Sequence, residues 1–337
     1  MTTKDEDLET FGDTILVTGG AGYIGSHTCK ALAEAGYKPV VLDNFSNSNS
    51  WAVRWGPLEE GDIGDKGFLD GVMQRHQPKA VIHFAGLIEV GESVKHPARY
   101  YQNNVSGTIS LLSAMERHGV DKIIFSSSAA VYGTPELPAP LDEECSKSPV
   151  NPYGQTKLMA EKIIADFGES YGLGYVLLRY FNAAGADPAG ELGESHDPES
   201  HLIPRLLEAA HGSGAGATIN GDDYDTPDGS CVRDYIHVSD LAAAHVLALG
   251  KLENGLKNGI YNLGYGRGYS VKEVLQAVCR VTGVEVKATI APRRAGDPPS
   301  LVADPSKVIT ELGWSPKHDT LDEIVSTAWS WFSRQSQ

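Results

Sequence analysis

Cysteine is scarce in this sequence, with four in 337 residues. None of Cys29, Cys145, Cys231 and Cys279 lies within three residues of another, so the CxxC spacing of metal and redox motifs is missing. A chain of this length can build its own hydrophobic core, and four scattered cysteines do not suggest a disulfide scaffold. We therefore expect free thiols and a cytoplasmic location.

Long hydrophobic runs are also missing. The longest apolar stretches, such as residues 80–90, have half the length that a membrane span needs, and that stretch contains Glu89. The first nine residues are acidic and carry no apolar run, so we do not expect a signal peptide. The sequence therefore predicts no membrane partner.

Basic residues are fewer than acidic ones. The sequence contains 28 Lys and Arg residues and 44 Asp and Glu residues, which gives a net charge of −16 at pH 7. Broad contact with nucleic acid needs a basic face, so we expect no nucleic-acid partner. Small anionic ligands are compatible with this charge, since a few arginines and a helix N-terminus can hold a phosphate inside an acidic protein.

Short, continuously apolar segments alternate with helical patterns through the first half of the chain. The predicted strands lie at residues 14–18, 39–43, 58–61, 80–84, 122–126 and 175–179, of which 58–61 is the weakest. Apolar strands without alternation are buried on both faces, which is typical of a parallel sheet covered by helices. The pattern predicts an α/β fold with a doubly wound parallel sheet of the Rossmann type.

The composition changes after Asn182, and residues 183–230 are rich in Gly, Pro, Asp and Asn. Regular patterns resume at residues 203–210, 232–249, 270–282 and 321–332. We expect a Rossmann-type domain at residues 12–181 with a returning segment near 232–265. Residues 182–231 and 266–337 then form a smaller C-terminal α/β domain that binds the substrate.

A glycine-rich turn follows the first predicted strand. Residues 20–25 (GAGYIG) have the pattern G-x-G-x-x-G, with Gly19 directly before them and a predicted helix after them. The glycines allow close approach of a pyrophosphate, and the helix N-terminus offers free N–H groups. Asp43 ends the second strand, where a carboxylate binds ribose hydroxyls, and no arginine in residues 44–49 would bind a 2′-phosphate. The turn predicts NAD rather than NADP, the alternative being an ordinary glycine turn.

A second motif, Tyr153-x-x-x-Lys157, follows Pro152, which favours a helix start. The spacing places both side chains on one helix face. The hydroxyls of residues 126–128 end the fifth strand, at the edge of a parallel sheet where ligands bind. A serine, a tyrosine and a lysine are therefore expected to meet near the nicotinamide, the alternative being a solvated helix face.

These residue types match the oxidation of a secondary alcohol, which needs a base for the hydroxyl proton. A phenol with a pKa near ~10 is a poor base, but an ammonium about 6 Å away lowers that pKa by about two units. Tyr153 can then act as general base and, in reverse, as general acid. Ser128 can hydrogen-bond the same substrate oxygen.

These two motifs and five further short segments resemble those of the UDP-glucose 4-epimerases, a group within the extended short-chain dehydrogenase/reductase family. The five segments are residues 83–86 (HFAG), 90–93 (VGES), 178–182 (LRYFN), 232–238 (VRDYIHV) and 292–297 (PRRAGD). The resemblance covers residues 13 to 332. It implies NAD bound by the first domain and a UDP-sugar bound with the help of the second.

The resemblance also implies roles for individual residues. The catalytic residues would be Ser128, Tyr153 and Lys157. The NAD site would contain Gly19, Gly22, Tyr23, Ile24, Gly25, Asp43, Asn44, Asp62, Ile63, Phe84, Ala85, Gly86, Asn103, Ser126, Tyr153, Lys157, Tyr180 and Phe181. The substrate site would contain Ser128, Tyr153, Asn182, Leu202, Arg233, Arg294, Asp297 and Leu301. Arginines suit a diphosphate, although either one alone could be surface charge and Asn182 alone a turn residue.

The implied activity is NAD-dependent inversion at C4 of a UDP-sugar, UDP-glucose or UDP-galactose, through a transient 4-keto intermediate. The sugar is left open, because UDP-xylose/UDP-arabinose and UDP-N-acetylhexosamines are alternatives. At position 301, a Tyr is associated in the family with plain hexoses and a Cys or Ser with N-acetylhexosamines, so Leu301 suggests intermediate room or mere core packing. Relatives are commonly homodimers that pair the helices near 96–118 and 152–171.

Two other functions are weighed against this one. A nucleotide-sugar 4,6-dehydratase would have an Asp-Glu pair where Ala129 and Ala130 stand. A non-enzymatic dinucleotide sensor would typically lose Tyr153 or Lys157, and both are present.

The sequence departs from the family pattern at Ile88, where a Lys is common, and at Asn220, where an aromatic side chain is common. His83 and His237 lie on predicted strands, and we expect hydrogen-bonded core residues there rather than metal ligands. We see no cluster of His, Asp and Glu with zinc spacing and expect no metal.

Overall fold

The computed structural model describes residues 12–135, 140–212, 216–294 and 297–335. The acidic N-terminal segment, and Ala295 and Gly296 of the segment at residues 292–297, lie outside these ranges. Within them, no helix is both long enough and apolar enough to cross a membrane.

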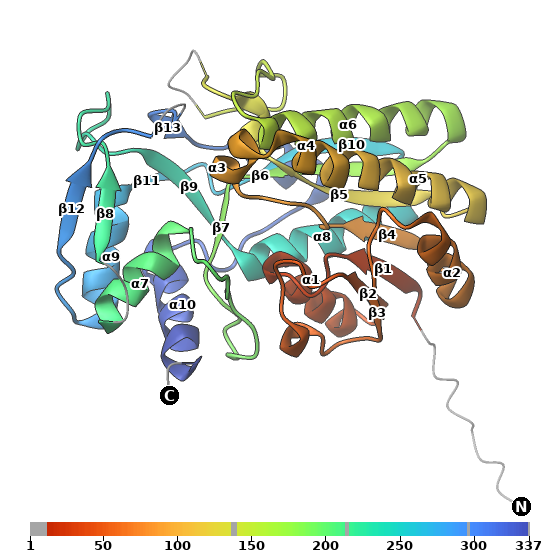
Figure 1. Ribbon diagram of the computed structural model, residues 1–337, viewed down its shortest axis with the longest axis horizontal. Coiled ribbons are helices and arrows are strands. Elements are labelled where there is room, and N and C mark those ends of the chain that lie inside the picture. Colours follow the sequence, from red (N-terminus) through yellow and green to blue (C-terminus); the bar gives the residue numbers. More distant parts are fainter. Residues whose placement is uncertain (1–11, 136–139, 213–215, 295–296, 336–337) are drawn as a thin grey trace, which may run out of the picture.

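A seven-stranded sheet forms the centre of the larger part (Figure 1). Its strands, in spatial order, are β10 (Asn258–Leu263), β6 (Gly174–Tyr180), β5 (Lys122–Ser128), β4 (Ala80–His83), β1 (Thr14–Thr18), β2 (Lys38–Asp43) and β3 (Leu58–Glu60). Every neighbouring pair is parallel. The predicted doubly wound parallel sheet is confirmed, and β10 is a strand that the sequence pattern did not single out.

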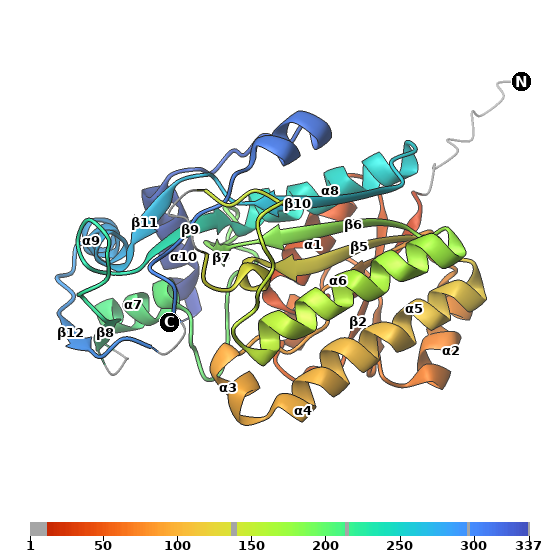
Figure 2. The ribbon, with the colours of Figure 1, turned by 90° about the horizontal axis from the view of Figure 1, so that it is seen from above.

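Helices cover both faces of this sheet (Figures 1 and 2). One face packs against α1 (Tyr23–Glu34) and α8 (Val238–Glu253), and the other against α2 (Lys66–His76), α5 (Gly107–His118) and α6 (Pro152–Tyr171). Shorter helical elements are α3 (Val90–Lys95), α4 (Pro97–Tyr100) and the turns Ser50–Ala52, Tyr101–Ser106, Ala129–Tyr132 and Val308–Leu312.

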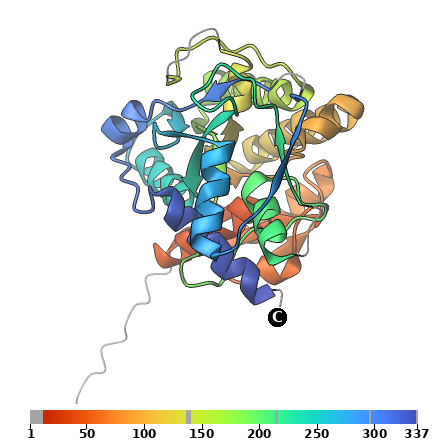
Figure 3. The same ribbon diagram turned by 90° about the vertical axis from the view of Figure 1, so that its left-hand side faces the viewer.

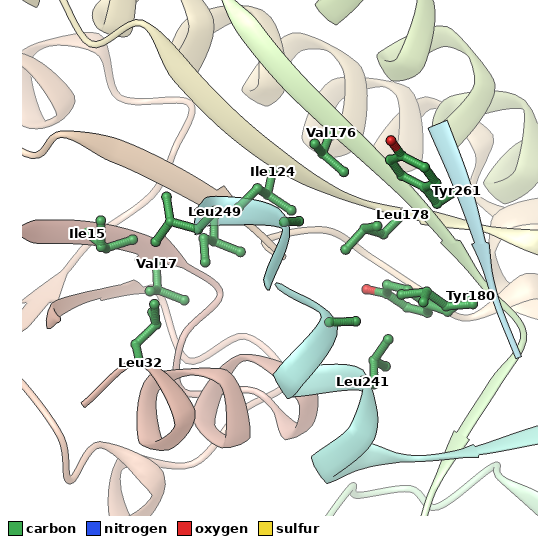
Figure 4. Packing of buried hydrophobic residues seen from close by; sticks show 14 of the residues in the cluster. Ile15, Val17, Leu32, Ile124, Val176, Leu178, Tyr180, Leu241, Leu249 and Tyr261 are labelled. Atoms are coloured by element: carbon green, nitrogen blue, oxygen red, sulfur yellow. The ribbon is translucent and has the colours of Figure 1, made fainter. Parts of the chain in front are cut away.

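The two hydrophobic cores follow from the alternation of side chains along each strand. Ile15 and Val17 of β1 pack with Leu241 and Leu249 of α8 in one core (Figure 4), whereas Leu16 belongs to the core on the opposite face. Because both faces are buried, the central strands β1 and β4 are apolar along most of their length.

The smaller part, which faces the viewer in Figure 3, is built around a second sheet. In it β9 (Val232–His237) pairs with β7 (Asn182–Ala184), β11 (Gly268–Ser270) and β13 (Ser300–Leu301). Strands β8 (Ala217–Asn220) and β12 (Ala288–Ala291) form a separate pair. A third core joins this part to α7 (Leu202–His211), α9 (Val271–Thr282) and α10 (Leu321–Gln335). The sequence predicted that a segment near residues 232–265 returns to the first domain. Its first strand, β9, pairs in this second sheet instead. Helix α8 packs against the main sheet, and β10 pairs with β6 at the edge of that sheet.

A buried ion pair between Arg179 and Glu161 links α6 to the main sheet. Arg179 of β6 donates hydrogen bonds from Nε and Nη2 to the two carboxylate oxygens of Glu161, at 2.8 and 2.6 Å. Its Nη1 donates to the hydroxyl of Tyr132 at 3.1 Å, and the hydroxyl of Ser127 on β5 donates to Glu161. Arg179 is 2 % exposed and Glu161 4 %. The pair therefore links β5, β6 and the helix that carries Tyr153 and Lys157.

We predict that Arg179→Met lowers the free energy of unfolding by about 3–5 kcal/mol, because it leaves the Glu161 carboxylate buried without its partner. Urea unfolding measures the loss. The double variant Glu161→Met/Arg179→Met removes both charges and should recover most of the stability. A single variant as stable as the parent protein would contradict this account.

Candidate active site

A cavity of about 1070 Å³ opens where the carboxyl ends of the main strands meet the smaller part. This is the edge at which open parallel sheets bind ligands. The volume lies just above the ~300–1,000 Å³ usual for a single ligand, so it suits a large ligand or two ligands together.

The structure brings almost every expected site residue to this cavity. Its walls include Gly19, Gly22, Tyr23, Ile24, Gly25, Asp43, Asn44, Ile63, Phe84, Ala85, Gly86, Asn103, Ser126, Ser128, Tyr153, Lys157, Tyr180, Phe181, Asn182, Leu202, Arg233, Arg294, Asp297 and Leu301. Asp62 is the exception, since it does not line the cavity. It contacts the site through Asn44, whose Nδ2 donates to Asp62 Oδ2 at 2.8 Å.

The glycine-rich turn leaves no space for side chains. Gly19 has φ +71°, and a Cβ atom on it would lie 2.6 Å from the backbone N of Ala85. A Cβ on Gly25 would lie 2.2 Å from the carbonyl oxygen of Gly19. Helix α1 begins after Gly22 without a side-chain cap from any described residue, so its first N–H groups are available to an anion. The turn is therefore suited to a dinucleotide pyrophosphate.

Asp43 is held between the turn and the second strand. Its Oδ2 accepts from the backbone N–H of Ala21 at 3.0 Å, and its Oδ1 accepts from the N–H of Phe45 at 3.0 Å and from the Ser48 hydroxyl at 2.7 Å. A carboxylate has about four acceptor positions, so one remains for a donor such as a ribose hydroxyl.

Ser128, Tyr153 and Lys157 meet at the end of β5. Helix α6 begins where the side chain of Asn151 accepts from the N–H of Gly154 at 2.9 Å, and Pro152 is its first residue. Lys157 Nζ lies 5.9 Å from the ring centre of Tyr153 and donates to the carbonyl oxygen of Ser126 at 2.7 Å.

The acid–base groups are strongly affected by burial. Burial lowers the pKa of Lys157 to about 8, although the nearby Glu161 carboxylate opposes this shift. Burial also raises the pKa of Tyr153, and the Ser128 hydroxyl offsets only part of the rise. We expected Lys157 to lower the pKa of this phenol. In the protein alone the cost of burying a phenolate is the largest cause, and the Glu89 carboxylate adds to the rise in the Tyr153 pKa.

The substrate side of the cavity carries two arginines. Arg233 of β9 forms an ion pair with Asp297. When the Asn220 amide is turned so that its oxygen faces Arg294, that oxygen accepts from Arg294 Nε at 3.2 Å and from Nη2 at 3.3 Å, which satisfies both groups. Asn220, which departs from the family pattern, therefore supplies a polar partner for an arginine instead of an aromatic surface.

Comparison with known proteins identifies the family. The sequence model of the NAD dependent epimerase/dehydratase family matches residues 15–264. This chain belongs to that family. A UDP-glucose 4-epimerase of Rhizobium leguminosarum bv. trifolii is 52% identical over 326 residues, covering 97% of this chain and 99% of the relative. The UDP-arabinose 4-epimerase 1 of Arabidopsis thaliana is 45% identical over an alignment of 333 positions that covers 94% of this chain and 78% of that protein.

Solved structures agree with the family assignment. The crystal structure of the UDP-glucose 4-epimerase from Brucella ovis in complex with NAD has a TM-score of 0.93 and 53% identity to this chain. The match covers 95% of this chain and 98% of that one. The expected Rossmann-type fold and NAD dependence are thus confirmed for this member of the epimerase/dehydratase family.

Leu301 of this family member both lines the cavity and packs against other side chains. It lies on β13 beside a buried cluster that includes Val131, Tyr132 and Leu158. From the sequence, Leu301 could either border the sugar pocket or pack in the core, and in the structure it does both. Ile88 also lines the cavity, as an apolar side chain where many family members have a Lys.

The two strand histidines are hydrogen-bonded core residues, as expected. His83 lies between the hydroxyls of Thr18 and Thr108, at 2.7 and 3.0 Å, and burial lowers its pKa to about 3, so it is neutral at pH 7. His237 Nε2 contacts the hydroxyl of Thr327 at 3.0 Å.

The sequence reasoning missed a second group on the cavity wall. Glu194, His196, Glu199 and His201 bring their ligand atoms within 4.8 Å of one another. We expected no such cluster, because the spacing matches no familiar zinc motif. The loop folds back on itself and so gathers residues that a linear spacing does not relate. The available signal was the run E-x-H-x-x-E-x-H.

Proposed function

We propose that this protein inverts the configuration at C4 of a UDP-sugar with NAD as cofactor, interconverting UDP-glucose and UDP-galactose. One observation carries the proposal. A single cavity contains a dinucleotide-binding turn, a Ser–Tyr–Lys group and two arginines. The names of the relatives that cover nearly the whole chain support the same reaction.

Tyr153 is the proton acceptor in this proposal. When bound, NAD supplies a reversible hydride acceptor and a positive ring that favours the Tyr153 phenolate. Tyr153 takes the proton of the 4-hydroxyl while the C4 hydride leaves, and it returns the proton when the hydride comes back to the opposite face. Ser128 donates a hydrogen bond to the substrate oxygen. Lys157 holds its ammonium near the phenol ring, anchored on the carbonyl of Ser126.

Arg233 and Arg294 would hold the diphosphate while the 4-keto sugar turns over in the cavity. Guanidinium groups donate several charge-assisted hydrogen bonds to phosphate oxygens. In the protein alone each arginine has an acceptor partner, Asp297 or Asn220, which orients it toward the same cavity. Asn182 and Leu202 complete this wall.

The dehydratase alternative is less consistent with the site. An elimination of water from the sugar needs an acid–base pair after the strand-five hydroxyl. Ala129 and Ala130 occupy those positions, and Ala129 is buried. The sensor alternative does not account for the retained Tyr153 and Lys157.

We predict that Tyr153→Phe lowers turnover of UDP-galactose by at least about a hundredfold, the scale of general acid–base catalysis. The phenyl ring remains, so purified variant should contain as much NAD as the parent protein, measured by chromatography after denaturation. Tyr171→Phe, at an exposed tyrosine of the same helix, is the control and should keep full activity. Near-normal turnover of Tyr153→Phe would remove this residue from the mechanism.

The preferred sugar is proposed from the side chain at position 301. Leucine is smaller than tyrosine and larger than serine or cysteine, and it offers no hydroxyl. A missing CH₂OH group changes binding in an apolar pocket by about 1–3 kcal/mol, too little for strict exclusion. We therefore propose good activity on UDP-glucose and UDP-galactose, measurable activity on UDP-pentoses and weak activity on N-acetylated sugars.

Leu301→Tyr should depress the N-acetylhexosamine reaction far more than the glucose/galactose reaction, because the larger ring takes space beside the sugar. Product separation on the substrate panel gives both rates. Leu301→Met keeps the volume similar and should leave the ratio of rates unchanged. Equal losses on both substrates in Leu301→Tyr would mean that the residue acts through core packing alone.

A cytoplasmic homodimer is proposed as the working form. All four cysteines are free thiols, which suits a reducing compartment. Helices α5 and α6 lie side by side on the outside of the molecule (Figure 2), and each exposes an apolar side chain, Ile109 and Met159. Pairing these helices between two copies would bury that surface.

Light scattering should therefore give twice the mass of one chain. Ile109→Glu/Met159→Glu places charges on the proposed interface and should give the mass of a single folded chain. Ile309→Glu, at an equally exposed isoleucine away from α5 and α6, should remain dimeric. A parent protein of single-chain mass at micromolar concentration would contradict the dimer.

A further inference from the structure

The segment between β7 and α7 begins and ends in the smaller part of the molecule and contacts the larger part on its way. In Figure 1 it runs down from β7, passes between α10 and α1, and returns to α7. Lys30 of α1 binds Asp187 and Glu191 at 2.8 and 2.7 Å. On the other side, Trp331 Nε1 of α10 donates to the carbonyl oxygen of Glu194 at 3.1 Å. The segment is therefore an ordered bridge with contacts to both parts.

Four side chains of this bridge converge at its end. Glu194, His196, Glu199 and His201 each place one nitrogen or oxygen within 4.8 Å of the other three. His201 directly precedes α7, and all four residues line the cavity. Two carboxylates and two imidazoles at these distances can supply the four donors of a four-coordinate metal ion.

The two histidines lie close to both carboxylates of the cluster. Nδ1 of His201 lies 2.7 Å from Glu194 Oε1 and 3.4 Å from Glu199 Oε1. Nδ1 of His196 lies 3.3 Å from Glu194 Oε1 and 3.7 Å from Glu199 Oε2. Both Nδ1 atoms are buried, and none of these contacts among the described residues has the geometry of a hydrogen bond. The His196 side chain is 9% exposed and that of His201 44%.

We propose that Glu194, His196, Glu199 and His201 bind one divalent transition-metal ion of the zinc class. The nitrogen lone pairs and carboxylate oxygens of the four residues then share a single cation, which gives a well-directed partner to the two Nδ1 atoms that make no hydrogen bond among the described residues. Two carboxylates balance the double positive charge. Calcium and magnesium prefer sites made of oxygen alone, so the two imidazoles favour zinc over either.

The ion would have a positioning role. Its ligands come from both sides of the turn at residues 197–198, so it would close the bridge at the point where α7 begins with Leu202. Tyr23 of the glycine-rich turn donates to the carbonyl oxygen of Gly185 at 2.6 Å, at the start of the same bridge. The metal would therefore stabilise the wall that joins the cofactor turn to the substrate side of the cavity.

Metal analysis of the intact protein tests the proposal without reference to activity. The protein is treated with a chelator, reloaded with zinc and separated from excess zinc. Its zinc content is then measured by elemental mass spectrometry. We expect about one zinc per chain. Zinc at about a hundredfold excess over its dissociation constant should raise the melting temperature by about 5 °C.

Variants separate this site from adventitious binding. His196→Ala and Glu199→Gln should both lose the bound zinc and the shift in melting temperature, and Glu199→Gln keeps the side-chain shape if His196→Ala does not fold. His118→Ala removes a surface imidazole elsewhere and should retain the zinc. Reloading with cobalt should give visible absorption in the parent protein that Glu199→Gln lacks. Less than a tenth of an equivalent of zinc in the reloaded parent, or equal zinc in Glu199→Gln, would overturn the proposal.

Discussion

The ion pair between Arg179 and Glu161 is the contact on which the geometry of the active site depends. It is almost completely buried, and it joins β6 to the middle of α6 while Ser127 of β5 donates to the same carboxylate. Ser126 and Ser128 lie on that strand, and Tyr153 and Lys157 lie on that helix. Because a buried charge is costly without its partner, the helix has one stable position against the sheet.

The cavity depends on the meeting of two sheets. The main sheet supplies the glycine-rich turn, Asp43 and the serine strand, whereas β9 and β13 of the second sheet supply Arg233 and Leu301. The bridge from β7 to α7 contacts helices of both parts, and α8 carries the chain from β9 of the second sheet to β10 of the main sheet. A cavity of this kind has room for cofactor and sugar nucleotide side by side, the arrangement that a hydride leaving and returning requires.

Burial has opposite effects on the two acid–base groups. It makes the ammonium of Lys157 easier to deprotonate and the phenol of Tyr153 harder to deprotonate. The protein chain alone therefore keeps Tyr153 in the neutral form. Coupling the base to a positively charged cofactor would restrict proton abstraction to the loaded enzyme, which limits side reactions of an empty site.

Local sequence determined the features that depend on short-range chemistry. The apolar strands, the glycine turn before α1, Asp43 at the end of β2, and the Tyr153–Lys157 face of α6 were all predicted, because each follows from a few neighbouring residues. Only the tertiary structure decided what depends on distant partners. It placed β9 in the second sheet, paired Asn220 with Arg294, reversed the expected shift of the Tyr153 pKa, and gathered Glu194, His196, Glu199 and His201. Burial and the folding back of loops set these outcomes, and neither can be derived from the spacing of residues along the chain.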